Sequence, residues 1–179
     1  SLIAEGNLCH PSGVYFYAKA EIEIQDFLFA LAAFDGLRPS VDRSKATTAV
    51  YVGAVKSGVN PLRSWLGELG LLGKRATSKR LPDVVWCMDE SELAEFVAAL
   101  WQGDGCISLT SGGQIYYATS SKVLACDVQH ALLRLGIPAT IHPKTFRYRG
   151  GTKDGFTIHV SGKECIERFA STVGERLLE

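Results

Sequence analysis

Residues 101–107 read WQGDGCI and place one acid between two glycines, where the pattern predicts that an apolar helix runs into a strand. The preceding segment, ESELAEFVAAL at residues 90–100, has apolar side chains at helical spacing. Asp104 is therefore expected at the C-terminus of a helix, where the helix dipole is negative and a carboxylate is unfavourable. Because a bound cation would remove this conflict, we predict that Asp104 binds a divalent metal ion.

The composition is that of a globular protein. The chain has 179 residues, of which 46% are hydrophobic, so it can fill a real core. No stretch approaches the roughly 20 apolar residues of a membrane span, and the first residues lack the charged start of a signal peptide. The five cysteines are scattered without a CxxC spacing, which indicates reduced thiols. We expect a cytoplasmic protein without a membrane partner.

The charges are sorted along the chain although the formal net charge is zero. Residues 36–80 contain nine lysines and arginines against only Asp42 and Glu68, whereas residues 81–107 contain acids and no lysine or arginine. This pattern permits a cationic face without a basic isoelectric point. Two solvated faces of opposite sign would give the same pattern.

The predicted elements occur twice in the same order, at an offset of about 100 residues. Downstream of WQGDG, the patterns predict strands at 106–111 and 114–120, a helix within 120–137, strands at 138–149 and 155–162, and a helix at 163–174. Upstream, a Tyr-rich strand and a helix at 13–34 precede strands at 38–45 and 47–55 and a helix at 59–73. We predict an α+β fold with two pseudo-symmetric αββαββα halves at 1–78 and 91–179. Residues 79–90 form the linker, in which Leu81-Pro82 prevents a continuous helix.

The first-half counterpart of Asp104 is either Glu5, in LIAEGNL, or Asp35, in FDG. The Glu5 segment has the same order of apolar helix, acid, glycine and strand. Asp35 aligns better with the end of the internal helix of the second half, and choosing it would leave the Tyr-rich strand outside the first repeat. We therefore take Glu5 as the counterpart.

Two helices that each end in acid-glycine can pair across a pseudo-twofold axis if small residues let their backbones approach. The two carboxylates would then meet and repel unless cations lie beside them. Carboxylate oxygens suit Mg²⁺, which shares its coordination shell with substrate phosphates and can activate water for phosphodiester hydrolysis. The predicted helix–helix interface consists of Ala4, Gly6, Ala98, Ala99, Gly103 and Gly105.

Several ordered segments resemble one protein family. LIAEGNL and VAALWQGDGCI are similar to the two signature motifs of the LAGLIDADG homing endonucleases. KRLPDVVW resembles the Lys-x-Ile-Pro block of members carried by inteins, and residues 116–137 and 158–174 resemble the downstream intein blocks. LIAEGNLCHPSGVYFY is particularly similar to inteins of the catalytic subunit of bacterial replicative DNA polymerase.

The resemblance implies a monomer with internal pseudo-twofold symmetry, whose strands form a saddle over double-stranded DNA. It implies that Glu5 and Asp104 bind Mg²⁺ and cut both strands. Lys79 would stabilise developing charge or position the attacking water, although a solvated linker lysine is the alternative. For the matching basic residue of the second half, Lys144, Lys122 and Lys153 remain open.

The sequence departs from the family pattern in three respects. The first motif starts at Ser1, so its first three positions are absent and the N-terminal helix is expected to be truncated. Glu5 replaces the commoner aspartate. No splicing nucleophile with a following Thr-x-x-His, and no terminal His-Asn, is visible. The chain thus resembles an endonuclease domain whose partner is the splicing domain of a parent intein.

DNA contacts are expected from outward-facing strand positions, where long polar side chains reach phosphates and base edges. Four tyrosines of the strands serve either packing or recognition: Tyr15, Tyr17, Tyr116 and Tyr117. The four histidines lack the clustered spacing of metal ligands, so we assign no metal role to His10, His130, His142 and His159. The predicted DNA-binding residues are Arg38, Ser40, Arg43, Lys45, Thr47, Ser108, Thr110, Gln114, Tyr116, Lys144, Arg147 and Arg149.

The same scaffold can also serve a second class of function. A maturase-like or decayed module would bind nucleic acid without cutting it. The presence of both acids favours the enzyme, whereas the truncated first motif and the zero net charge favour the binder. A domain used only for protein contacts would leave the basic run from Arg38 to Arg80 unexplained.

Overall fold

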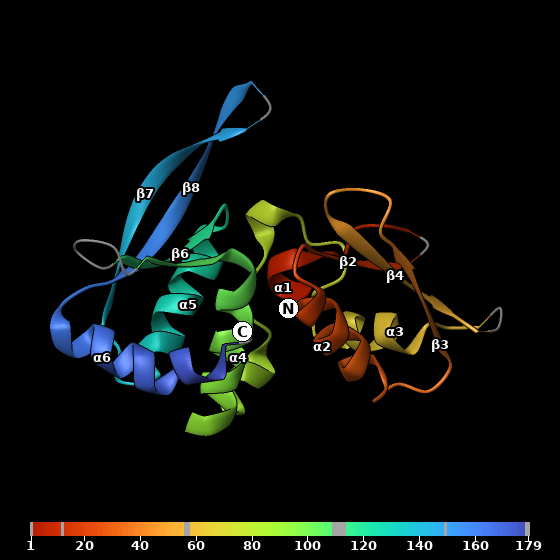
Figure 1. Ribbon diagram of the computed structural model, residues 1–179, viewed down its shortest axis with the longest axis horizontal. Helices are drawn as coiled ribbons and strands as arrows, with labels where there is room; N and C mark the ends of the chain where they lie inside the picture. The colour runs from red at the N-terminus through yellow and green to blue at the C-terminus, as the bar shows by residue number, and fades with distance from the viewer. Residues whose placement is uncertain (1, 12, 56–57, 109–113, 149, 178–179) are drawn as a thin grey trace. The chain divides into compact units, whose positions relative to one another are not determined.

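The computed structural model describes residues 2–11, 13–55, 58–108, 114–148 and 150–177 (Figure 1). The chain divides into two compact units, residues 1–75 and residues 76–177. Within the described ranges, no helix combines the length and the apolar character needed to cross a bilayer.

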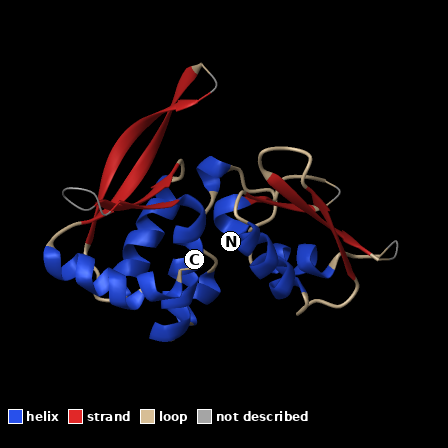
Figure 2. Cartoon of the chain, in the orientation of Figure 1, coloured by secondary structure: helices blue, strands red, loops and turns tan. Residues whose placement is uncertain are grey.

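The first unit contains one antiparallel sheet and three helices (Figure 2). Its strands are ordered β1-β2-β4-β3, so the two hairpin partners β3 and β4 extend the short β1–β2 pair. The elements are α1 (Leu2–Glu5), β1 (Gly6–Asn7), β2 (Val14–Ala18), α2 (Glu21–Leu31), β3 (Leu37–Asp42), β4 (Thr48–Ala54) and α3 (Pro61–Glu68).

The second unit repeats this order after two short 3-10 turns, and its strands are ordered β5-β6-β8-β7. The predicted repetition of αββαββα is therefore confirmed. Its elements are η1 (Ala76–Ser78), η2 (Asp83–Cys87), α4 (Glu90–Asp104), β5 (Gly105–Ser108), β6 (Gln114–Thr119), α5 (Lys122–Arg134), β7 (Ala139–Tyr148), β8 (Gly151–Val160), α6 (Lys163–Thr172) and η3 (Gly174–Arg176).

Local capping explains where several helices begin. The Asn60 side chain accepts a hydrogen bond from Arg63 N at 3.1 Å, and Pro61 occupies the first helical position of α3. Asp89 and Glu92 form a reciprocal capping box at the start of α4, with bonds of 2.9 and 3.0 Å. These signals act between residues close in sequence, so the helix starts could be predicted without the tertiary structure.

Each unit buries one face of its sheet under its own helices. In the first unit the Phe16 and Phe27 rings lie 4.4 Å apart between β2 and α2. In the second unit Tyr117 of β6 is fully buried, and Trp101 of α4 contacts the Phe169 ring of α6 at 4.9 Å. The side chains of alternate strand positions point away from this core, which leaves a second, open face on each sheet.

Residues 79–90, which we predicted as a linker, lie within the second unit and contact α5. Leu81 and Val85 are buried, and Leu81 N donates to Asp127 Oδ2 at 2.9 Å. The Arg134 guanidinium donates to the carbonyls of Val85 and Met88 at 3.2 and 2.8 Å. The segment is thus fixed to the second unit by hydrogen bonds to residues that lie more than forty positions downstream.

Two strand boundaries differ from the sequence-based expectation. β3 ends at Asp42, whose side chain accepts from Ser44 N at 2.9 Å and turns the chain. The hairpin of β7 and β8 is longer than predicted, because β8 begins at Gly151 and pairs with Tyr148. Most of the segment GGTKDG therefore lies in a strand instead of a turn.

Candidate metal centre and nucleic-acid interface

Both sheets begin at a junction of the same kind, at which a helix ends in an acidic residue and a glycine opens the next strand. α1 ends at Glu5 and α4 ends at Asp104, and a glycine opens the next strand in each case. A Cβ atom at Gly6 would overlap the carbonyl of the residue four positions earlier, and so would a Cβ atom at Gly105. Glycine is therefore required where each helix passes directly into a strand.

This junction decides between the two candidates for the first-half acid. Asp35 is exposed in the turn between α2 and β3, where no helix passes directly into a strand. Glu5 and Asp104 occupy equivalent positions in the two units. Their predicted roles as metal ligands remain proposals.

The carboxylate of Asp104 lies in a partly desolvated environment with two partners. The Tyr117 hydroxyl donates to Asp104 Oδ2 at 3.4 Å. Burial raises the pKa of Asp104 above its ordinary value, while the positive charge of Lys79 and the hydrogen bond from Tyr117 act in the opposite direction. The neighbourhood thus disfavours an isolated negative charge and would be stabilised by an added cation.

Lys79 is held in this neighbourhood by its main chain. The Ser121 hydroxyl donates to the Lys79 carbonyl at 2.6 Å and also accepts from Leu124 N at 3.2 Å, where it caps α5. Ser121 is fully buried. One side chain therefore fixes both the start of α5 and the segment that carries the Lys79 charge. The sequence did not single out Ser121, because its contact with Lys79 spans 42 positions.

The residues at these junctions fit a hard divalent cation that keeps part of its water shell. Within the described ranges, no three His, Cys, Asp or Glu side chains gather into a complete protein-only ligand set. A carboxylate at such a junction suits Mg²⁺, which completes its octahedral shell with waters and phosphate oxygens. The partly desolvated Asp104 supports such a site, because the charge of the ion favours the ionised carboxylate.

The residues predicted to form the helix–helix interface have different environments. Ala98 is buried and Ala99 is exposed on α4, so the two point to different sides of this helix. Ala4, Gly6, Gly103 and Gly105 are half-buried. The pairing of α1 with α4 stays a prediction.

The open face of the second sheet carries four of the predicted DNA-binding residues. Ser108 lies opposite Gln114, and Tyr116 lies opposite His159. Lys144 reaches the same face from β7, with its Nζ 5.8 Å from the centre of the Tyr116 ring. These side chains form a polar and aromatic surface that suits contact with phosphates and bases.

Other predicted DNA-binding residues of the second half have different positions. Arg147 is exposed but lies an odd number of residues from Lys144, so it points to the opposite face of β7. Thr110 and Arg149 lie outside the described residues. Of the lysines considered as the second basic group, Lys122 is exposed at the start of α5, and Lys153 lies opposite Phe146 in the β7–β8 hairpin.

In the first unit, only part of the predicted set lies on the open face of the sheet. Ser40 lies opposite Tyr51 and Arg38 opposite Gly53, both on that face. Arg43, Lys45 and Thr47 lie in the turn after β3 and not at strand positions, which corrects the expectation.

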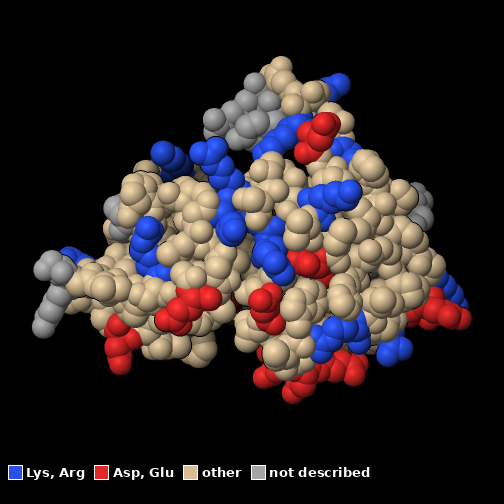
Figure 3. All heavy atoms as spheres, turned by 180° about the vertical axis from the view of Figure 1, so that it is seen from behind, with Lys and Arg blue, Asp and Glu red and all other residues tan. Residues whose placement is uncertain are grey.

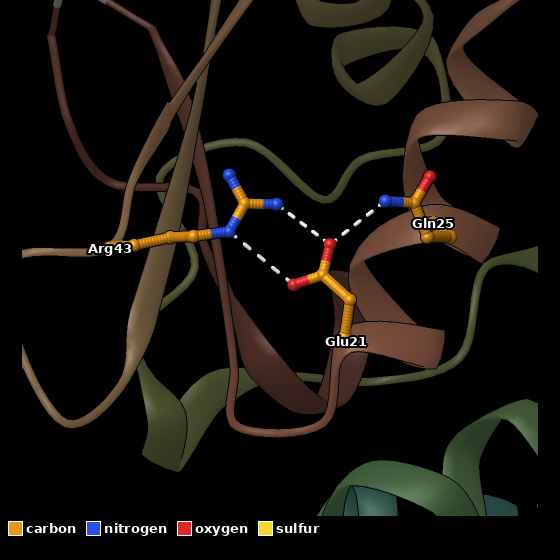
Figure 4. Close-up of polar contacts among 3 residues, drawn as sticks. All are labelled: Glu21, Gln25 and Arg43. Atoms are coloured by element: carbon orange, nitrogen blue, oxygen red, sulfur yellow. Dashed lines mark hydrogen bonds and ion pairs between the residues drawn. The ribbon is translucent and has the colours of Figure 1, made fainter.

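Arg43 is also engaged by an acid of its own unit. Its Nη2 lies 2.7 Å from Glu21 Oε1, and Gln25 Nε2 donates to the same oxygen at 2.8 Å (Figure 4). Both hydrogen bonds lower the pKa of Glu21, and the bond from Arg43 has the larger effect. Arg43 would have to exchange this carboxylate for a phosphate before it could bind DNA.

Two histidines of the open face were missed as candidate interface residues. His159 stacks on Tyr116 with ring centres 5.3 Å apart, and His142 meets His159 edge-on at 5.3 Å. Burial, then the charges of His142 and Lys144, lower the pKa of His159. The register of β7 against β8 brings these residues together, so their spacing in the sequence carried no signal.

Acidic side chains gather around the first turn of α4, which contains Glu90 and Glu92 (Figure 3). Their negative charges stabilise the N-terminus of α4, because the helix dipole is positive there. A polyanion such as a DNA backbone would be repelled there, so the open sheet face suits a polyanion better than this helix end does.

The comparisons with known proteins agree with this architecture. Residues 91–174 match the family model described as the LAGLIDADG-like domain. The structure of I-DmoI in complex with DNA and Mn has a TM-score of 0.61 at 17% identity, covering 89% of this chain and 79% of that chain. The fold is the LAGLIDADG homing endonuclease fold. The N-terminal LAGLIDADG domain of DUF199/WhiA is also similar, with a TM-score of 0.58 at 11% identity over 97% of this chain and 77% of that chain.

The curated relatives are much longer proteins. The replicative DNA helicase DnaB of Rhodothermus marinus is 39% identical over 64% of this chain, and DnaB of a Nostoc species is 32% identical over 92% of it. The aligned part makes up 12% of the first relative and 20% of the second. The chain therefore spans a fifth or less of the length of these relatives.

Proposed function

We propose that the chain is a homing endonuclease domain that makes a double-strand break in DNA with the help of Mg²⁺. The observation that carries this proposal is the equivalence of Glu5 and Asp104, each at a helix end followed by an obligatory glycine. The I-DmoI structures, which were solved with DNA and Mn, Ca or Mg, support dependence on a divalent ion.

Each protein group has a defined task in this mechanism. Glu5 and Asp104 would hold the metal ions, and a bound Mg²⁺ supplies Lewis acidity and an activated water. Lys79, whose charge acts on Asp104, would stabilise negative charge on the scissile phosphate. On the open face of each sheet, polar side chains would contact the phosphates and bases of the duplex; they are Arg38, Ser40, Gln114, Tyr116 and Lys144.

The relatives also support an insertion context. An element that accounts for a fifth or less of each DnaB chain agrees with an intein, with the splicing domain of that intein as the partner of this monomeric domain. The target would then be the uninterrupted host gene. DnaB and the catalytic subunit of replicative DNA polymerase are the two host genes to test.

The test uses plasmids that carry the uninterrupted coding sequence of either host. Wild-type protein with Mg²⁺ is expected to linearise one of them, and chelation with EDTA is expected to stop the reaction. Glu5→Gln and Asp104→Asn should both abolish linearisation while a gel shift persists. Ser91→Ala, which alters an exposed side chain on α4, serves as the neutral control.

The alternative function is a nucleic-acid-binding module that does not cut. A wild-type protein that shifts the target in a gel but neither nicks nor linearises it at any Mg²⁺ concentration would establish this alternative and refute the nuclease.

A further inference from the structure

The open face of the first sheet carries a cluster of aromatic side chains. Tyr15 of β2 lies opposite Tyr51 of β4, and their ring centres are 5.0 Å apart. The His10 ring meets Tyr15 edge-on at 4.9 Å, and the Tyr17 ring lies nearly parallel to Tyr15 with ring centres 6.1 Å apart. All four side chains are half-buried, so the cluster keeps contact with solvent. We call these four residues the aromatic platform.

Small residues make room for these rings. A Cβ atom at Gly13 would overlap the Tyr51 ring, and a Cβ atom at Gly53 would approach Tyr51 Cε1 to 3.1 Å. Glycine at both positions therefore leaves the space that the Tyr51 ring occupies. The neighbour of Tyr17 on β4 is also small, because the register places Ala49 opposite it. The aromatic platform thus consists of rings set among small residues, with a low surface beside Tyr17.

The open face of the second sheet lacks one of these rings. Tyr116 corresponds to Tyr15, because each lies one residue before the strand partner of the junction glycine. Two positions later the second sheet has Ala118 where the first sheet has Tyr17. The Tyr116 ring is also stacked against His159, with ring centres 5.3 Å apart. The first sheet is therefore the better surface for stacking an aromatic ligand.

Aromatic surfaces of this kind recognise nucleic-acid bases that are not paired. In a duplex, the bases stack on one another and present only their edges in the grooves, where long hydrogen-bonding side chains read them. An unpaired base exposes its face, which can stack on a tyrosine whatever the sequence. The strand positions beside the rings carry Ser40, Ala49 and Gly53, which are too short to read base edges in a groove.

We propose that the aromatic platform binds single-stranded DNA, with one base stacked on the Tyr17 ring above Ala49. The Asp42 carboxylate lies exposed on β3 opposite Ala49, where it accepts a hydrogen bond from an amino group of that base. The same charge keeps phosphates away from the rings. Arg38, which is exposed opposite Gly53 on the same face, pairs with a phosphate of the bound strand.

The ligand is DNA in preference to RNA. A ribose 2′-hydroxyl beside Ala49 would lose water without gaining a side-chain partner, which disfavours RNA at this position. The inference goes beyond the proposed function, because it concerns DNA that is not paired and does not require cleavage.

Tyr17→Ala tests the proposal, because it gives the first sheet the side chain that the second sheet already has. A fluorescently labelled oligodeoxynucleotide is titrated with protein at fixed salt, and its anisotropy is followed. Tyr17→Ala should weaken binding of the single strand about tenfold, as loss of one stacking ring does. Affinity for the duplex of the same sequence should change less than about twofold, because paired bases do not offer their faces.

Tyr17→Phe is the matched control, because it keeps the ring and loses only the hydroxyl. Its affinity for the single strand should stay within about twofold of that of the wild type. Circular dichroism spectra of both variants show whether the first unit keeps its fold.

A second probe tests the wild-type protein without any substitution. An abasic oligonucleotide of the same length keeps the phosphates and lacks the bases. The wild-type protein should bind it at least about tenfold more weakly than the ordinary single strand. An oligoribonucleotide of the same sequence should bind no more tightly than the DNA.

A crosslinking experiment locates the bound base. Single-stranded DNA that carries 5-iododeoxyuridine is irradiated in the complex, and the crosslinked peptide is identified by mass spectrometry. The crosslink is expected on β2, which contains Tyr15 and Tyr17, and not on β6, which carries Tyr116.

The outcomes separate this proposal from the nuclease proposal. Equal affinity of wild-type protein and Tyr17→Ala for the single strand overturns it, and so does equal affinity of the wild-type protein for the abasic strand. Tighter binding of RNA than of DNA, or an equal loss of single-strand and duplex binding in Tyr17→Ala, also overturns it. If the wild-type protein cuts no DNA but Tyr17→Ala still loses only single-strand binding, the nuclease proposal fails while the role of the aromatic platform stands.

Discussion

Ser121→Ala removes two hydrogen bonds that one buried hydroxyl makes in the second unit. The hydroxyl caps α5 by accepting from Leu124 N at 3.2 Å, and it donates to the Lys79 carbonyl at 2.6 Å. Loss of a serine cap costs about 1 kcal/mol, and loss of a net hydrogen bond costs about 1 kcal/mol more. We therefore expect the free energy of unfolding to fall by about 2 kcal/mol.

Urea unfolding followed by circular dichroism and tryptophan fluorescence measures this loss. Trp86 and Trp101 belong to the second unit and report its unfolding. The control Ser91→Ala changes an exposed side chain in the first turn of α4 and should stay within about 0.5 kcal/mol of the wild type.

The functional consequence tests the link between Ser121 and Lys79. Releasing the Lys79 main chain should slow DNA cleavage under conditions where the variant is still folded, with DNA affinity little changed. A Ser121→Ala variant that loses less than about 0.5 kcal/mol and cuts at the wild-type rate would show that this hydroxyl neither caps α5 nor fixes Lys79.

Three further perturbations have expected outcomes. Glu21→Gln should release Arg43 and raise DNA affinity severalfold at low salt in a gel-shift titration, with a steeper salt dependence; an unchanged salt slope would show that Arg43 does not reach DNA. Since the folded-state pKa of His159 lies below its unfolded value, its contribution to stability should be present above the unfolded pKa of about 6.5 and be lost as the pH falls through the folded pKa. His159→Gln should flatten this part of the pH profile of urea unfolding, and identical profiles would contradict the assignment. Gly105→Ala should cost about 3 kcal/mol or more because its Cβ would overlap the Trp101 carbonyl and ring; a thermal midpoint equal to that of the wild type would refute this steric argument.

Much of the architecture followed from local patterns in the sequence. The apolar spacing of residues 90–100 predicted α4, the Asn60-Pro61 pair predicted the start of α3, and the acid-glycine junctions at Glu5 and Asp104 were found from the repeat. Helix caps, periodicity and glycine turns act over a few residues, so each can be recognised in the sequence without the rest of the fold.

The contacts around the site could not be predicted in this way, because they join residues that are distant in sequence. The Ser121 hydroxyl reaches Lys79 across 42 positions, and the contact between His142 and His159 depends on the register of β7 against β8. A change of one residue in that register would move every strand side chain to the other face of the sheet. The sequence by itself therefore determined the order of elements and the positions of the two acids. Only the tertiary structure decided which side chains surround Asp104 and which lie on the open face, since strand register and packing select these neighbours.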